Sequence, residues 1–352
     1  MALFRDSNTS GITYTGATLF DLVTKDKMQS LQDFIKTLTQ YPRVVIQAHD
    51  FPDHDAVASA FALGHLLQLS GIKTLLLYNG MIDRISLQNM IETLAIPIRH
   101  WQESDLNDND IIITVDGCIG EKNVTDLPGS EIAVIDHHLV TPPPGLWFTD
   151  VRQEYGSTAT IIFEYYQALN TSIPTDVATA LQIGQAIDTA NLTRGFVQAD
   201  IDAFSHLHNI ADQELVSRIS RNSIQQDELL YYQKLLEDVQ IMDGMAFAFL
   251  VEGCPKNMLG ILGDFLLALN EVDVVIVAAN TPDNILLSLR SECSQTNAAI
   301  LVQSVVQDND IGFGGGHSHM AGGIIKREQF EHQFSIADLS QLFLDCRQEM
   351  RN

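Results

Sequence analysis

Residues 131–138 read Glu-Ile-Ala-Val-Ile-Asp-His-His, an apolar run that ends in one acid and two imidazoles. The run has the length and the β-branched side chains of a buried strand. Residues 44–48 and 111–115 are similar apolar runs, and they lead into His49 and Asp116. Because the carboxyl ends of parallel strands meet at one edge of a sheet, we expect these polar side chains to lie close together.

Strand-like and helix-like segments alternate over most of the first 200 residues. This alternation is typical of βαβ units, and it predicts an α/β fold whose first domain is a doubly wound, mainly parallel sheet. The expected strands are 43–48, 74–78, 111–115 and 131–135, and the expected helices are 27–40, 56–70, 84–94, 156–169 and 175–189.

A second, smaller α/β module is expected after a polar helical stretch. Its expected strands are 246–251, 272–279 and 284–290, its expected helices are 257–269, 297–306 and 336–350, and a Gly-rich loop covers 312–323. The chain is therefore divided into an N-terminal extension (1–25), a first α/β domain (26–200), a helical connector (201–240) and a second α/β domain (241–352).

The charge balance restricts the class of partner. Lys and Arg total 20 against 45 Asp and Glu, which gives a formal net charge of −25. This excess of acid disfavours long duplex nucleic acid, whose binding depends on neutralising many phosphates. A short phosphorylated substrate is still compatible, because bound divalent cations reverse the local field.

The sequence gives no sign of a membrane segment. No apolar run approaches the roughly 20 residues that span a bilayer, and the first residues lack the pattern of a secretory signal. The four cysteines are widely spaced and form no CxxC pair. We therefore expect a cytoplasmic protein without a disulfide framework or a zinc-thiolate site.

The segment after the first strand carries one imidazole and two further acids, His49, Asp53 and Asp55. Helix N-capping is the alternative role for an acid in this position, and it would explain one of the two. Asp188 lies in the last turn of the expected helix 175–189, where a carboxylate is disfavoured by the helix dipole. A nearby cation would compensate that penalty.

These groups together favour a divalent-metal site. Oxygen ligands with imidazole and without thiolate suit Mn²⁺, with Mg²⁺ or Co²⁺ as alternatives. Two ions that share a carboxylate would polarise a phosphoryl group and activate a water molecule. The sequence therefore predicts hydrolysis without a covalent protein nucleophile.

Two features of the second module suit anion binding. Gly315 and Gly316 precede His317, and glycines let backbone N–H groups approach a phosphate closely. An ordinary turn is the alternative. Arg290 ends an expected strand and suits an anion clamp, with surface solvation as the alternative.

The chain resembles the DHH phosphoesterases that carry a C-terminal DHHA1 domain, most of all the group of nanoRNase / pAp phosphatases and exopolyphosphatase-related proteins. The motifs lie between about residues 40 and 325, in the order of the family: His49-Asp-Phe-Pro-Asp53-His-Asp55, Asp116, Asp136-His137-His138, Asp188-Thr189 and Gly314-Gly-Gly-His317. His54 and Met320 stand where the family more often has small residues.

The resemblance implies a role for each matched residue. It implies one ion held by His49, Asp53 and Asp116. A second would be held by Asp55, His137, Asp188 and Asp116, with Asp116 bridging. His138 would face the scissile phosphate and Asp136 would orient the neighbouring imidazole, so that Asp116, His138 and Asp136 form the catalytic set. Arg290, Gly315, Gly316 and His317 would hold the distal phosphate or nucleotide, with Arg194 as a further substrate contact.

The resulting expectation is a Mn²⁺-dependent phosphoesterase that acts on short oligonucleotides or on 3′-phosphonucleotides such as pAp, with a possible homodimer formed through the first domain. The alternatives are an inorganic pyrophosphatase or exopolyphosphatase, and a non-catalytic nucleotide-sensing module.

Overall fold

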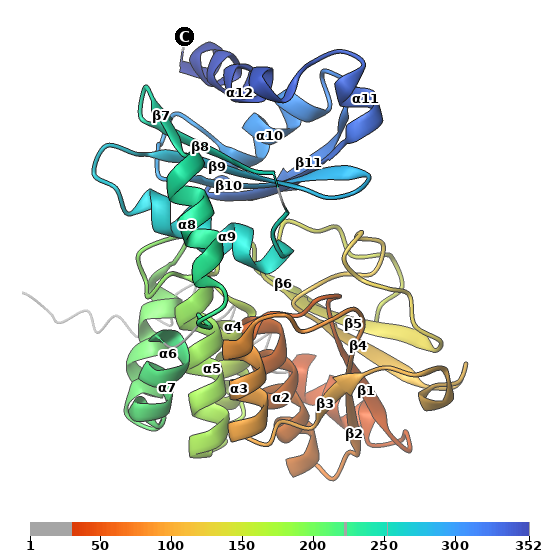
Figure 1. Ribbon diagram of the computed structural model, residues 1–352. Coiled ribbons are helices and arrows are strands. Elements are labelled where there is room, and N and C mark those ends of the chain that lie inside the picture. Colours follow the sequence, from red (N-terminus) through yellow and green to blue (C-terminus); the bar gives the residue numbers. More distant parts are fainter. Residues whose placement is uncertain (1–29, 222–223, 252, 352) are drawn as a thin grey trace, which may run out of the picture. The chain divides into compact units, whose positions relative to one another are not determined.

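Six strands form an all-parallel first sheet in the order β3-β2-β1-β4-β5-β6 (Figure 1). The computed structural model describes residues 30–221, 224–251 and 253–351. The strands are β1 (Val44–Ala48), β2 (Thr74–Tyr78), β3 (Ile98–His100), β4 (Ile111–Val115), β5 (Ser130–Asp136) and β6 (Phe148–Val151). The expected parallel α/β fold is confirmed. The expected N-terminal extension lies outside the described residues.

Strand order determines where the functional edge of this sheet lies. The chain runs from β1 outward to β2 and β3, and then returns to β4 on the other side of β1. In such a sheet the crevice for ligands opens between the two strands where the order reverses, here β1 and β4. Ala48 pairs with Val115 across this point. The next residues, His49 and Asp116, therefore begin the loops on either side of it.

Helices α2 (His54–Leu69), α4 (Thr158–Ala168) and α5 (Thr175–Asp188) lie side by side in the first unit (Figure 1). Helix α2 packs on β1 and β2, and α4 packs on β5. Alternate residues of the strands point to the other face, where Val45, Leu77 and Ile112 pack with the loop residues Leu106 and Leu127. Helix α3 (Ile85–Thr93) and a short 3₁₀ turn, η1 (Glu103–Asp105), complete this part of the chain.

The described chain divides into two units within the segment that we expected to be a helical connector. Residues 30–82 and 89–221 belong to the first unit, and residues 83–88 with those from 224 onward belong to the second. Helices α6 (Gln198–His208) and α7 (Gln213–Arg221) pack on α5, whereas α8 (Leu229–Asp238) packs on the second sheet and on α9.

The second sheet is mixed and has the order β11-β12-β10-β9-β8-β7, with β8 and β9 as its parallel pair. Its strands are β7 (Gln240–Met242), β8 (Met245–Leu250), β9 (Val274–Asn280), β10 (Asn284–Ser291), β11 (Gly312–Gly316) and β12 (Met320–Lys326). Its helices are α9 (Lys256–Leu267), α10 (Ala298–Val306), α11 (Arg327–Glu331) and α12 (Ile336–Arg351).

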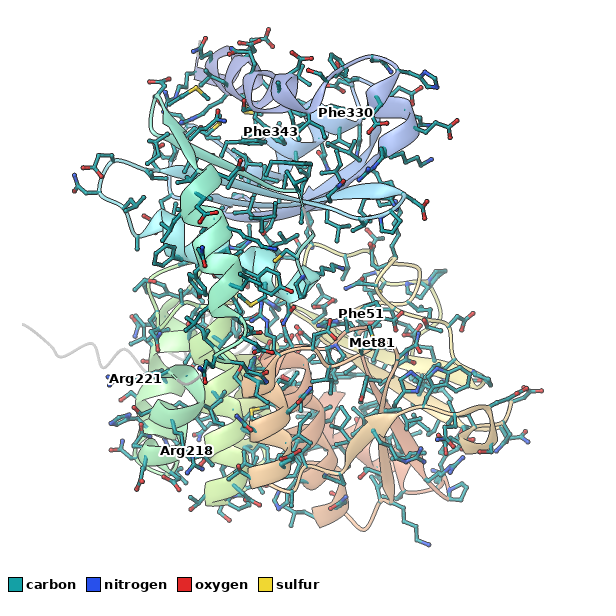
Figure 2. All side chains as sticks on the ribbon, viewed as in Figure 1. Phe51, Met81, Arg218, Arg221, Phe330 and Phe343 are labelled. Atoms are coloured by element: carbon teal, nitrogen blue, oxygen red, sulfur yellow. The ribbon has the colours of Figure 1, made fainter. Side chains whose placement is uncertain are left out.

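Each face of the second sheet has its own apolar core. Phe247 and other alternate residues of β8 pack with α10 and α12, and Phe330 and Phe343 are buried in this core (Figure 2). Ala246 and Ala248 face the opposite side, where they pack with α8 and α9. Among the described residues no helix is both long and apolar enough to cross a membrane.

The expected Gly-rich loop at 312–323 is wrong in structural type, because most of it forms the β11–β12 hairpin. Added side-chain carbons on Gly312 and Gly314 would contact Val306 and Val302 of α10. Glycine in a strand often marks such a close approach. In the structure these glycines lie in a strand, where they let α10 pack directly on the hairpin. The short strands β3, β6 and β7 were also missed.

We predict that Gly312→Ala lowers the thermal unfolding midpoint, because the added carbon would overlap the carbonyl oxygen of Ile324. The expected decrease is about 3–10 °C, from overpacking of this size. Gly315→Ala is the matched control in the same strand, since its added carbon has no neighbour closer than 3.9 Å. Differential scanning calorimetry measures both variants, and equal midpoints for the two would contradict the packing argument.

Candidate metal centre

The carboxyl edge of the first sheet brings together residues from five segments of the chain. His49 follows β1, Asp116 follows β4, and Asp136 is the last residue of β5. The backbone N–H of Asp116 donates to the carbonyl of Ile135 at 2.9 Å, so the ladder continues one residue beyond the strand. The start of α2 and the end of α5 add Asp55 and Asp188 to the same edge.

Three overlapping groups of side chains could each hold a metal ion. Within each group the ligand atoms lie within 4.8 Å of one another. The groups are His49, Asp53 and Asp116; Asp116, His137 and His138; and Asp55, His137 and Asp188. Asp116 belongs to two of the groups and His137 to two, which makes the three groups one continuous cluster.

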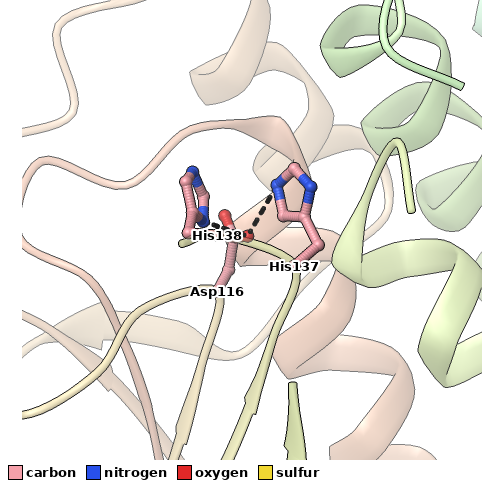
Figure 3. Close-up of side chains that lie close together, drawn as sticks. All are labelled: Asp116, His137 and His138. Carbon is pink, nitrogen blue, oxygen red and sulfur yellow. Dashed lines mark ion pairs between the residues drawn. The ribbon is translucent and has the colours of Figure 1, made fainter. Parts of the chain in front are cut away.

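Asp116 lies at the centre of this cluster (Figure 3). Its Oδ2 is 3.7 Å from Nε2 of His49, and its Oδ1 is 3.5 Å from Nε2 of His137 and 3.7 Å from Nδ1 of His138. On the far side of His137, Nε2 is 3.4 Å from Oδ2 of Asp188. These gaps are longer than hydrogen bonds. They suit ligand atoms that share a cation at about 2.1 Å from each.

Backbone contacts orient two of the imidazoles toward the carboxylates. Nδ1 of His49 lies 2.8 Å from the carbonyl oxygen of Asp50, and Nδ1 of His137 lies 3.1 Å from that of Tyr155. When Nδ1 carries the proton and donates it to a carbonyl, Nε2 presents its lone pair to the cluster. This second contact of the ring is the usual arrangement for a histidine that binds a metal.

Asp136 orients the third imidazole instead of joining the cluster. Its Oδ1 accepts from the backbone N–H of His138 at 3.0 Å and lies 2.8 Å from Nδ1 of the same residue. The side chain of Asp136 is buried, whereas that of His138 is about one-third exposed. His138 is therefore held with its Nδ1 toward the protein.

Helix α4 supports two of the acids through its first turn. Asp55 accepts from the backbone N–H groups of Thr158 and Ala159, at 2.7 and 2.9 Å. The Thr158 hydroxyl donates to Oδ1 of Asp116 at 2.9 Å. A helix N-terminus stabilises negative charge, so α4 offsets part of the cost of burying both carboxylates. Asp53 caps helix α2, since its Oδ1 accepts from the N–H groups of Asp55 and Ala56 at the start of that helix.

Thr158 and Asp200 are parts of this arrangement that sequence reasoning missed. Asp200, a buried residue of α6, accepts from Gly156 N–H at 2.9 Å, from the Thr160 hydroxyl at 2.6 Å and from Val197 N–H at 2.8 Å. It therefore ties α6 to the start of α4. The Gly156-Ser157-Thr158 run at the start of the expected helix 156–169 was the available signal for Thr158. Asp200 gave none, because it looks like an ordinary acid in a polar helix.

The protonation behaviour of the cluster fits a cation site. Burial raises the pKa of Asp116 to about 6, and burial with the charges of Asp116 and Asp188 raises the pKa of Asp55 well above its usual value. Burial alone would lower the pKa of His49, but Asp53 and Asp116 raise it to about 9. The carboxylates thus retain protons on themselves or on neighbouring imidazoles, and a divalent cation would replace those protons.

One buried oxygen gives an independent test of this fit. Oδ2 of Asp116 is buried and accepts no hydrogen bond within the described part of the chain. A buried polar atom without a partner costs free energy, and a cation would satisfy it. Asp116 also has a φ of 56°, in the left-handed region that few residues other than glycine adopt. Such strain often marks a functional position.

The predicted substrate contacts and His54 lie outside the three groups of candidate metal ligands. Arg194 is in the turn that follows α5, and His54 is buried at the start of α2, outside the three ligand groups found in the described residues. In the second unit, Gly315 and Gly316 are in β11 and His317 begins the hairpin turn.

Arg290 pairs with Met320 across β10 and β12, close in the sheet to that turn. Its side chain is buried, and it donates to the Asp264 carboxylate at 2.6 Å and to the Ser288 hydroxyl at 3.1 Å. Substrate binding by Arg290, Arg194 and the hairpin residues stays a prediction.

We predict that Thr158→Val weakens Mn²⁺ binding by about 10–100-fold, the usual effect of removing a partner of a metal ligand. The valine keeps the shape but cannot donate to Asp116. Thr158→Ser is the control, because it keeps the hydroxyl and should bind Mn²⁺ nearly as the parent does. Isothermal titration calorimetry gives the affinities, and a valine variant with the parent affinity would show that this hydrogen bond is unimportant.

Known proteins of the same fold include an exopolyphosphatase-related protein from Bacteroides fragilis. Its crystal structure has a TM-score of 0.73 and 18% identity, over 92% of this chain and 98% of that one. An uncharacterized protein of Methanocaldococcus jannaschii is 28% identical over 283 residues, which are 80% of this chain and 58% of that protein. The cyclic-di-AMP phosphodiesterase PdeA of Listeria monocytogenes is 24% identical over 323 residues, 85% of this chain and 46% of PdeA. The chain thus spans about half the length of these two relatives.

Two family descriptions match separate parts of the chain. Residues 43–185 match the DHH family, N-terminal domain, and residues 243–340 match the DHHA1 domain. Together they cover more than half of the 352 residues. The first match contains five of the six predicted metal ligands, all but Asp188. The resemblance seen in the sequence motifs is confirmed: the chain belongs to the DHH family and carries a DHHA1 domain.

Proposed function

We propose that this protein is a divalent-metal-dependent phosphoester hydrolase that uses Mn²⁺, with Mg²⁺ or Co²⁺ as alternatives. The observation that carries the proposal is the central position of Asp116 among imidazoles and acids from separate segments. One ion would be held by His49, Asp53 and Asp116. A second would be held by Asp55, His137 and Asp188 together with Asp116.

Such ions, when bound, neutralise phosphate charge and lower the pKa of an attacking water. The residues of the chain hold the reacting groups in place. His138 suits proton donation to a phosphate or leaving-group oxygen. Burial alone would lower the pKa of His138, but the effect of the Asp136 and Asp116 carboxylates outweighs that of burial and raises the pKa above its ordinary value. The imidazolium form of His138 therefore persists to higher pH.

For the substrate we propose short oligonucleotides or 3′-phosphonucleotides such as pAp. The name of the relative PdeA specifies a cyclic dinucleotide, which is a phosphodiester of the same size class. In the DHHA1 unit, Gly315, Gly316, His317 and Arg290 would meet the distal phosphate or nucleotide. Arg194 of the first unit is a further proposed substrate contact. The acidic net charge supports a small substrate over long duplex nucleic acid.

Inorganic pyrophosphate or polyphosphate is the alternative substrate. That chemistry needs a grip rich in Lys and Arg, whereas the chain has only 20 Lys and Arg against 45 Asp and Glu. A nucleotide sensor without turnover is the other alternative. It would bind nucleotide in the presence of Mn²⁺ and leave it intact.

A panel assay with Mn²⁺ tests the proposal. The panel contains pAp, RNA of two to five residues, linear and cyclic dinucleotides, and pyrophosphate. We expect release of mononucleotides from short RNA or of phosphate from pAp. Protein with bound Mn²⁺ that releases product only from pyrophosphate would support the alternative, and inactivity toward every compound would refute hydrolysis altogether.

We predict that Asp116→Ala lowers kcat by roughly a thousandfold or more, because it disturbs both ions and each contributes several kcal/mol to the transition state. His317→Ala should instead raise KM about tenfold, the effect of one lost charge-assisted hydrogen bond, and leave kcat nearly unchanged. Steady-state kinetics on the best substrate of the panel separate the two effects. Equal loss of kcat in both variants would contradict this division of roles.

A further inference from the structure

Phe51 is an exposed aromatic residue in the middle of the metal-binding segment. It stands between His49 and Asp53, in the turn that follows β1. Its side chain is 51% exposed, whereas the adjacent Pro52 is buried. Met81, which follows β2 at the same edge of the sheet, is 62% exposed (Figure 2). A large apolar side chain at the edge of a polar metal centre calls for an explanation.

The backbone of Phe51 is strained. Its φ is 56°, in the left-handed region, which is a genuine outlier for a bulky residue. Such a conformation persists only where the surrounding structure over-determines it, and it concentrates at ligand-binding sites. The backbone N–H of Phe51 donates to the carbonyl of Asn79 at 3.1 Å, which fixes the turn to the end of β2.

A network of hydrogen bonds also fixes the turn that carries Phe51. The Thr125 hydroxyl donates to the Asp50 carboxylate at 2.7 Å, and the Asn79 amide donates to the Thr125 hydroxyl at 2.8 Å. Gly80 lies under the aromatic ring, since a side-chain carbon on Gly80 would lie 3.0 Å from Cδ1 of Phe51. The ring is therefore seated against backbone, and its position is set before any ligand arrives.

We propose that the Phe51 ring is a stacking surface for a base of the substrate, which makes it a specificity-determining residue for base-bearing phosphoesters. The inference rests on the proposed phosphoester hydrolysis and specifies its substrate class. A ring two residues from both His49 and Asp53 is placed for a base attached to a phosphate at the metal centre. A pre-seated ring also loses little conformational freedom when it binds.

Stacking on Phe51 would distinguish base-bearing phosphoesters from inorganic phosphates, which the metal centre alone would not distinguish. Every nucleobase has a π-face, so an aromatic platform binds bases with little sequence preference. Inorganic phosphate, pyrophosphate and polyphosphate have no such face. An apolar exposed ring gives them no favourable contact, so its effect should appear only with base-bearing ligands.

The first experiment compares KM for the linear dinucleotide pApA with the inhibition constant of inorganic phosphate. In Phe51→Ala we expect KM for pApA to rise on the order of tenfold, from the loss of one base–aromatic stack, with kcat and the phosphate constant nearly unchanged. Phe51→Tyr and Phe51→Trp keep an aromatic face and should keep KM within about threefold of the parent value.

Trp147→Ala is the matched control, because Trp147 is another exposed aromatic residue of the first unit, 47% exposed, and it lies beside Tyr41. This variant should leave both constants unchanged. If Phe51→Ala changed KM for pApA and the phosphate constant by the same factor, Phe51 would have a structural role and the inference would fail. It would fail equally if neither constant changed.

A binding experiment separates this inference from the proposed function. Phe51→Trp adds one indole to Trp101 and Trp147, and a stacked base should quench it. In Mg²⁺, we expect pAp to quench the variant more than the parent, and inorganic phosphate to have no effect. Inactivity toward all phosphoesters together with this quenching would refute hydrolysis while base stacking held. Turnover of pApA without any added quenching would refute stacking while hydrolysis held.

Discussion

The register of the parallel strands β1, β4 and β5 is the constraint on which the candidate site depends. Ala48 lies opposite Val115, and Val115 lies opposite Ile135, so β1 and β4 end at the same level and β5 ends one residue later. A slip of one residue in a strand would turn its side chains to the other face. The buried apolar residues of these strands fix the register. Because the register is fixed, the polar residues that follow the strands converge at one edge of the sheet.

Burial of several carboxylates at one edge of the sheet costs free energy. The structure offsets this cost with groups that contact the carboxylates and with further groups that hold those in place. The first turn of α4 binds Asp55 and Asp116, and Asp200 in turn holds the start of α4. The imidazoles of His49 and His137 are anchored to backbone carbonyls. Five of the six candidate ligands therefore have a second contact that sets their direction, as a precise metal centre requires: His49, Asp53, Asp55, Asp116 and His137.

The sequence predicted the parallel sheet, the ends of its central strands and the convergence of their polar residues, since these follow from local apolar runs. It missed β3 and β6, which are short edge strands with mixed side chains. It mistook β11 and β12 for a loop because glycine serves both turns and close packing, and only the position of α10 distinguishes the two uses. Thr158 and Asp200 were missed because their roles arise from contacts between distant segments. The roles of the individual metal ligands and substrate contacts came from the family resemblance, because no local sequence pattern specifies them.

The left-handed backbone at Asp116 restricts which residues can ever replace it. Asn and Gly tolerate this conformation, whereas β-branched and bulky residues do not. A descendant released from selection for its chemistry would therefore drift at this position toward Asn or Gly, with its sheet intact. The identity of one amino acid at this point would then report the loss of the proposed metal site, long before the fold itself had diverged.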